Sequence, residues 1–131
     1  MKKAAKIVII EEDLPMLHSI AFTLKRQGYA VCALADGKTA LKKLESVLLK
    51  EDGVSLVIID IQQSRMDGFE LACAVRAISG EVRMVLITSD AKRETLERFN
   101  NLGRAEVLCK PFTSEQLLVK AQSIVSDNNS L

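Results

Sequence analysis

The chain has 131 residues, a length that fits one domain and leaves no room within it for a separate output module. Hydrophobic residues make up 48% of the chain and charged residues 27%, which is enough apolar content for a buried core and too much for a disordered chain. The formal net charge of +1 provides no broad cationic surface, so we expect neither nucleic acid nor a membrane as a partner.

No stretch approaches the ~18 apolar residues of a membrane span, and we expect a cytoplasmic protein. Three scattered cysteines, Cys32, Cys73 and Cys109, form neither a disulfide framework nor a CxxC pair. We expect them to be small buried hydrophobic side chains in a reducing compartment.

The first half of the chain alternates apolar runs with amphipathic segments. Residues 7–10 are continuous and β-branched, which is typical of a strand buried on both faces. A helix follows, with Pro15 in its first turn and Gly28 as its stop. Residues 30–34 predict a second strand, and the next helix opens near Asp36.

The second half repeats this unit three times. Strands are predicted at residues 56–59, 84–87 and 106–109. A loop through Met66, Asp67 and Gly68 leads into the third helix, and the fourth helix stops at Gly103. The last helix opens with a capping-box pattern at residues 113–116. We therefore expect one domain over residues 1–126 and a frayed C-terminal tail over residues 127–131.

Five strand–helix units with short connections predict a single α/β domain of (βα)5 type. Such units form a parallel five-stranded sheet with right-handed crossovers and helices on both faces. In doubly wound folds of this kind the ligand lies beyond the carboxyl ends of the strands. The residues directly after each strand are therefore the candidate site.

Charged and polar residues occupy those positions. Glu11 and Glu12 follow the first strand, and Asp60, Thr88 and Lys110 follow the third, fourth and fifth. Three carboxylates facing one ammonium group are costly at low dielectric unless a cation binds. Carboxylates without cysteine or histidine favour Mg²⁺ or Mn²⁺. Asp60 could then attack a phosphoryl group whose oxygens the metal, Lys110 and Thr88 neutralise.

With the segments Met66-Asp67-Gly68-Phe69-Glu70, Thr88-Ser89 and Lys110-Pro111-Phe112, these residues make the chain resemble a two-component response-regulator receiver domain. The resemblance is to the CheY-like family and covers residues 6 to about 125. It implies a flavodoxin-like fold with strand order 2-1-3-4-5. It also implies that a histidine kinase or phosphotransfer protein phosphorylates Asp60, and that the domain has no enzymatic activity beyond handling its own phosphoryl group.

The resemblance also implies roles for single residues. Mg²⁺ or Mn²⁺ would be held by Glu12, Asp60 and the backbone carbonyl of Gln62, with Glu11 acting through a water molecule. Thr88 and Lys110 would hold the phosphoryl oxygens, and the Lys110-Pro111 peptide bond would be cis. Gln62 and Asp90 would flank the hydrolytic water. A downstream protein would bind the face formed by the fourth helix, fifth strand and fifth helix.

Three positions depart from the family pattern. Glu11-Glu12 stands where Asp-Asp or Glu-Asp is usual, which moves the metal-binding carboxylate outward by one methylene group. Gln63-Ser64 replaces Met-Pro, so we expect a more mobile loop. Val107 replaces the aromatic switch residue, which would weaken or replace the usual readout.

Other functions fit less well. Three acids after the first strand would repel the phosphate of a flavin. An aspartyl-phosphate hydrolase needs a second aspartate where Gln62 stands. No G-x-S-x-G elbow of an acyl hydrolase occurs. The alternative that stays open is a pseudo-receiver, in which the same fold serves as a phosphorylation-independent protein-interaction module.

Overall fold

A computed structural model of the chain describes residues 5–48 and 53–129, with side chains as far as residue 126. Strands and helices alternate in it as follows: β1 Lys6–Ile10, α1 Leu14–Arg26, β2 Ala30–Leu34, α2 Gly37–Leu48, β3 Leu56–Asp60, α3 Gly68–Ile78, β4 Arg83–Thr88, α4 Arg93–Asn100, β5 Ala105–Cys109 and α5 Ser114–Asn129. The strands form one parallel sheet in the order β2-β1-β3-β4-β5. Both the predicted (βα)5 architecture and the predicted strand order are confirmed.

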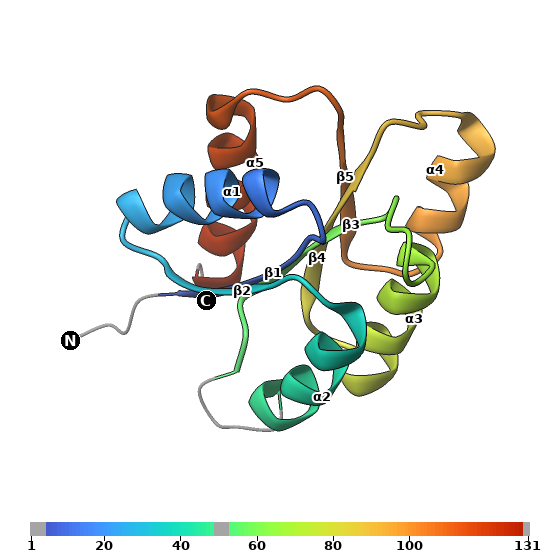
Figure 1. Cartoon of the computed structure of the whole chain (residues 1–131), viewed down its shortest axis with the longest axis horizontal. Helices are drawn as coiled ribbons and strands as arrows, with labels where there is room; N and C mark the ends of the chain where they lie inside the picture. The colour runs from blue at the N-terminus through green and yellow to red at the C-terminus, as the bar shows by residue number, and fades with distance from the viewer. Residues whose placement is uncertain (1–4, 49–52, 130–131) are drawn as a thin grey trace.

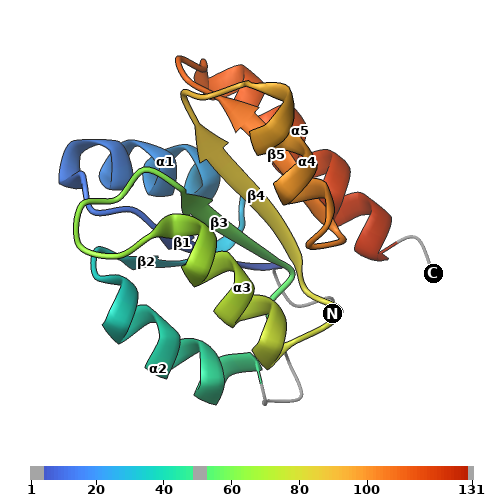
Figure 2. The same cartoon turned by 90° about the vertical axis from the view of Figure 1, so that its right-hand side faces the viewer.

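Helices lie on both faces of the sheet (Figure 1). On each face, an apolar cluster is formed by side chains of the strands and of the covering helices. Helices α1 and α5 cover one face, and α2, α3 and α4 cover the other. Figure 2 shows α2 and α3 running side by side across their face. Strand β3 is buried along its whole length, as its continuous apolar run predicts, whereas the edge strands β2 and β5 are partly exposed. The last residues of the central strands β3 and β4, Asp60 and Thr88, are therefore buried.

The expected burial of the cysteines is wrong. Cys73 and Cys109 are exposed, and Cys32 is half-buried. Cys32 and Cys109 lie on the two edge strands, each of which has a neighbour on one side only. Cys73 lies on the outer side of α3, next to the buried Ala72.

The last helix extends into the segment that the sequence predicts to be a frayed tail. Helix α5 continues to Asn129, so residues 127–129 are helical, and residues 130–131 lie outside the described residues. The apolar stripe ends at Val125, but no glycine or proline follows to stop the helix there. Within the part of the chain that the structure describes, no helix combines the length and the apolar character needed to cross a membrane.

Arg76 joins three segments at the end of the sheet opposite the candidate site. Its guanidinium group donates to the backbone carbonyls of Leu102 at 3.0 Å, Val82 at 2.6 Å and Gly103 at 2.6 Å. These carbonyls belong to the segment before β4 and to the turn between α4 and β5. One side chain thus satisfies backbone groups that would otherwise lack partners.

Arg76→Met is expected to lower the free energy of unfolding by about 1.5 kcal/mol, because it leaves several backbone carbonyls without donors. Urea unfolding monitored by circular dichroism measures this change. Arg93→Met is the matched control, because the Arg93 side chain is 92% exposed and forms a surface ion pair with Glu97 four residues on. That control should stay within about 0.5 kcal/mol of wild type. Equal losses in both variants would contradict the role of Arg76.

Candidate functional site

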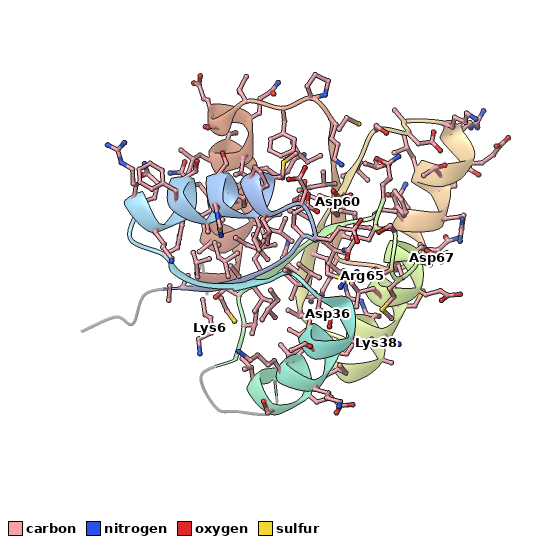
Figure 3. All side chains as sticks on the ribbon, viewed as in Figure 1. Lys6, Asp36, Lys38, Asp60, Arg65 and Asp67 are labelled. Carbon is pink, nitrogen blue, oxygen red and sulfur yellow. The ribbon has the colours of Figure 1, made fainter. Side chains whose placement is uncertain are left out.

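The residues predicted from the strand ends meet at one edge of the sheet. Figure 3 shows Asp60 at the end of the sheet away from Lys6, with Arg65 and Asp67 in the loop beyond it. Among the described residues, the buried side chains that are polar or charged are Glu11, Asp60 and Thr88, which are 2%, 3% and 1% exposed. Buried polar groups gathered at the ends of three neighbouring strands mark this edge as the candidate site.

Asp60 is held on both carboxylate oxygens. The Nζ atom of Lys110 donates to Oδ2 at 2.8 Å, and the backbone N–H of Gln62 donates to Oδ1 at 2.8 Å. Lys110 is placed by its own backbone N–H, which donates to the carbonyl of Thr88 at 2.8 Å. The Lys110-Pro111 bond is cis, as predicted. Asp60 is therefore a fixed, buried anion with its countercharge in contact.

Glu11 faces Asp60 across the end of the sheet. Its burial, a hydrogen bond to Asp60 and the Asp60 charge together raise the pKa of Glu11 to about 8, although Lys110 acts in the opposite direction. The Glu11 Oε2 atom is buried and has no hydrogen-bond partner. Two buried carboxylates share one nearby lysine, which contacts Asp60, and this leaves negative charge that a proton or a cation can neutralise.

Glu12 is bound by the loop between β3 and α3. The backbone N–H of Ser64 donates to Oε1 at 2.7 Å, and the Ser64 hydroxyl donates to Oε2 at 3.1 Å. The Gln63 side chain adds a hydrogen bond to the carbonyl of Asp60 at 2.8 Å. The sequence predicts a more mobile loop because Gln63-Ser64 replaces Met-Pro, but that prediction does not take these hydrogen bonds into account. The two bonds of Ser64 join the loop to the segment between β1 and α1.

Gln62 and Thr88 form hydrogen bonds with the loop after β4. The Gln62 Oε1 atom accepts from the backbone N–H of Ser89 at 3.0 Å and from its hydroxyl at 2.8 Å. The Thr88 hydroxyl accepts from the backbone N–H of Asp90 at 3.0 Å. Asp90 in turn accepts from the Thr95 hydroxyl at 2.9 Å. A chain of contacts thus runs from Thr88 to the start of α4.

Asp90 is firmly ionised in this arrangement. The backbone N–H of Lys92 and the hydroxyl of Thr95 lower the pKa of Asp90 below its usual value. A carboxylate that accepts two hydrogen bonds next to the first turn of α4 fixes how that helix begins. Hydrogen bonds therefore link Thr88, Asp90 and the first turn of α4.

Comparison with known proteins identifies the family of the chain. The family described as "Response regulator receiver domain" matches residues 7–122, which is most of the chain. The chain belongs to this family. It is thus a response regulator receiver domain of a two-component system, as the strand-end residues predicted.

Two relatives illustrate the range of the family. The response regulator MprA of Mycolicibacterium vanbaalenii is 27% identical over 122 residues, which are 92% of this chain and 50% of that protein. The present chain thus spans about half the length of the curated relative it matches. The chemotaxis protein CheY4 of Vibrio cholerae is 27% identical with a TM-score of 0.81, covering 92% of this chain and 98% of that one.

A receiver domain protein of Methanospirillum hungatei has the same fold. The two structures superpose with a TM-score of 0.85 at 24% identity, over 97% of this chain and 98% of the other. Family membership and fold are therefore shown by independent comparisons.

Receiver domains are generally Mg²⁺-dependent, and the residues present fit that ion in their chemistry. Carboxylates and a backbone carbonyl are the oxygen ligands that Mg²⁺ prefers. The unpartnered Glu11 Oε2 is a buried acceptor beside Asp60. Among the described residues, however, no three acidic, histidine or cysteine side chains are grouped to hold a metal ion. Glu12, the expected direct ligand, is bound to Ser64 instead.

Two features of this site were not predicted from the sequence. Ser64 was noted only as the absence of a proline, although a serine supplies the N–H donor that a proline lacks. Gly68 was assigned to a loop, yet a Cβ atom at this position would lie 2.3 Å from the Cα atom of Ile61. The serine at position 64, where the family usually has proline, was the sequence signal for the contact with Glu12. The Asp67-Gly68 pair was the sequence signal for the close approach of Gly68 to Ile61.

Proposed function

We propose that this receiver domain accepts a phosphoryl group on Asp60 from a histidine kinase or phosphotransfer protein in the cytoplasm, with Mg²⁺ as cofactor. The observation that carries the proposal is the buried Asp60 carboxylate with the Lys110 ammonium 2.8 Å from its Oδ2 atom. An anion that is fixed, shielded from water and paired with a cation suits nucleophilic attack on a phosphoryl group.

The chemistry requires few groups. An oxygen of Asp60 attacks the phosphorus of a phosphohistidine, and the new P–O bond forms as the P–N bond breaks. The departing imidazole keeps the electron pair of that bond and takes a proton from solvent. The Lys110 ammonium and the Thr88 hydroxyl neutralise phosphoryl oxygens, and they lie on the strand ends next to Asp60. Bound Mg²⁺, held by carboxylates at this edge, would supply further positive charge.

The signal would leave through a protein partner on the face of α4, β5 and α5. Movement of the Thr88 hydroxyl toward a phosphoryl oxygen would break its hydrogen bond with Asp90, whose carboxylate binds the first turn of α4. Val107 is half-buried in the cluster beneath α4 and is too short to switch between buried and exposed positions as an aromatic ring does. The Thr88–Asp90–Thr95 chain therefore offers a route that needs no aromatic switch.

Asp60→Asn is expected to abolish phosphorylation. Wild-type protein incubated with acetyl phosphate and Mg²⁺ should gain the mass of one phosphoryl group in intact-mass analysis, because acetyl phosphate donates to a reactive carboxylate without a kinase. Asp36→Asn is the matched control, since Asp36 also follows a strand but caps α2 through the N–H of Lys38. The control should keep the adduct. A wild-type protein without any adduct would leave the pseudo-receiver as the better description.

A further inference from the structure

Strand β2 is an edge strand that lacks the usual protection of a sheet edge. It pairs with β1 on one side, and no strand among the described residues pairs with its other side. Native proteins commonly protect such an edge with a charged residue, a proline or a bulge. The β2 sequence is Ala-Val-Cys-Ala-Leu, and its register with β1 is unbroken, so all three forms of protection are missing.

The opposite edge of the sheet is protected by charge. Strand β5 contains Glu106, whose side chain is 48% exposed and lies 3.8 Å from the Nζ atom of Lys120. A strand that paired with β5 would remove water from this charged group, which is unfavourable. The exposed side chains of β2 are those of Ala30 and Ala33, which are small and uncharged. Strand β2 is therefore the edge at which a further strand can pair.

The hydrogen bonds with β1 show which backbone groups of β2 point outward. The N–H of Ala30 donates to the carbonyl of Ala5 at 2.9 Å, and the carbonyl of Leu34 accepts from the N–H of Glu11 at 3.0 Å. Successive residues of a strand direct these groups to alternate sides. The residues at even positions of β2 therefore bind β1, and the residues at odd positions direct their N–H and C=O groups away from the sheet.

The outward-facing residues, Val31 and Ala33, are placed symmetrically about Cys32. A second copy of β2 can therefore pair antiparallel with the first, about a two-fold axis at Cys32. Val31 of each copy then lies opposite Ala33 of the other, and the two residues exchange both of their N–H···O=C bonds. Every outward backbone group of these residues gains a partner in this register. A shift by two residues would pair Val31 with itself or Ala33 with itself and leave the other unpaired.

Charges at the two ends of β2 favour the same arrangement. Helix α1 ends in Lys25 and Arg26 shortly before β2, and Asp36 follows β2. In the antiparallel pair, Asp36 of each copy lies opposite Gly28 of the second copy, next to that basic turn. Lys38 belongs to α2, which covers the other face of the sheet from α1. Unlike charges thus approach at both ends, whereas a parallel pair would bring like charges together.

We propose that two copies of this chain pair antiparallel through β2, about a two-fold axis at Cys32, and join their sheets into one. One short strand from each copy makes a small interface, so we expect a weak and reversible dimer. Strands β2 and β5 are opposite edges of the sheet, so the face of α4, β5 and α5 stays free. Strand β1 separates β2 from β3, which carries Asp60, and the inference does not rest on phosphorylation.

Cys32 provides a direct probe of this pairing. Residues opposite each other at a non-hydrogen-bonded position of an antiparallel pair have Cα atoms about 4.5 Å apart and side chains on the same face. This distance is within the range of roughly 4.4–6.8 Å that a disulfide bond spans. Diamide would oxidise the two Cys32 thiols as the S–S bond forms, and it would take up their two electrons and two protons to become a hydrazine.

The test compares three variants that each retain one cysteine, at the same protein concentration, by non-reducing electrophoresis after diamide is added. Cys32 is half-buried, whereas Cys73 and Cys109 are exposed, so random collision would link the Cys32 variant most slowly. Pairing through β2 predicts the reverse order. The Cys32 variant should form the disulfide dimer about tenfold faster than the other two, because pairing raises the effective concentration of its thiol.

Two substitutions of Ala33 in the Cys32 variant test the edge itself. Ala33→Lys places a charge on the edge, and Ala33→Pro removes an outward N–H that the ladder with β1 does not use. Each should slow dimer formation about tenfold while circular dichroism shows an unchanged fold. Ala77→Lys is the matched control, because Ala77 is an exposed alanine on α3, and it should keep the rate of the Cys32 variant.

Two results would overturn the proposed pairing. One is a Cys32 variant that forms dimers no faster than the Cys109 variant. The other is a folded Ala33→Lys variant that forms dimers as fast as Ala77→Lys, and this comparison decides the matter even where Ala33→Pro does not fold. Failure of the phosphoacceptor function would appear separately, as a missing acetyl phosphate adduct in the wild-type protein.

Discussion

Gly68→Ala is expected to lower the free energy of unfolding by about 3 kcal/mol, which is at the upper end for an added methyl group in a packed site. The new Cβ atom would lie 2.3 Å from both the Cα and the carbonyl oxygen of Ile61. These are backbone atoms, so no side-chain rotation relieves the overlap. Ile61 directly follows Asp60, and relief of the overlap requires moving the backbone that positions Asp60.

Urea unfolding monitored by circular dichroism measures the loss, and acetyl phosphate labelling should show a slower formation of the phosphoryl adduct. Gly80→Ala is the matched control, because a Cβ atom there meets nothing within 4 Å. That variant should stay within about 0.5 kcal/mol of wild type. A Gly68→Ala variant as stable as Gly80→Ala would contradict the close approach of α3 to the end of β3.

The stability of the metal-free domain is expected to fall as pH rises, by about 2–4 kcal/mol between pH 5 and pH 8.5. The cause is Glu11, whose pKa rises from 4.5 to about 8 on folding. Between these values the folded state binds a proton that the unfolded state lacks, so each increase in pH favours unfolding. The contribution is fully present below the unfolded pKa and is lost as pH passes through the folded one.

Denaturant titrations at a series of pH values, with a chelator present, measure this slope. Glu11→Gln should remove most of it and should be more stable than wild type at the alkaline end, because a neutral side chain then faces Asp60. Glu45→Gln should keep the wild-type slope. Added Mg²⁺ should raise stability most at alkaline pH, since metal ligands must be deprotonated. A wild-type profile without any slope would show that Glu11 is ionised in the folded domain.

The arrangement of the site follows from the sequence because strand ends in a parallel sheet meet at one edge. Asp60, Thr88 and Lys110 each come directly after a continuous apolar run, and the runs identify the strands. Once the strands were assigned, their common direction placed these side chains at one edge of the sheet, whereas the strand order was implied only by the family resemblance. The contact between Lys110 and Asp60 depends on both.

The partner of Glu12 could not be predicted in the same way. Its direction depends on hydrogen bonds with a loop residue 52 positions away, and no periodic pattern reports the rotamer of one side chain. The prediction that the cysteines are buried was wrong for a related reason. Residue type indicates average burial, whereas the position on an edge strand or on one face of a helix decides the burial of a single residue. Packing of Gly68 against Ile61 likewise became visible only with backbone coordinates.

The exposed sulfurs of Cys73 and Cys109 give this domain built-in attachment points for a spectroscopic label. Cys109 ends β5, directly before Lys110, and lines a groove of about 700 Å³ shared with α5. A thiol-reactive fluorophore on Cys109, in a Cys73→Ser background, would sit beside the lysine that contacts Asp60. Its emission would then report changes around Asp60 in real time, without radioactive phosphate and without an added tryptophan.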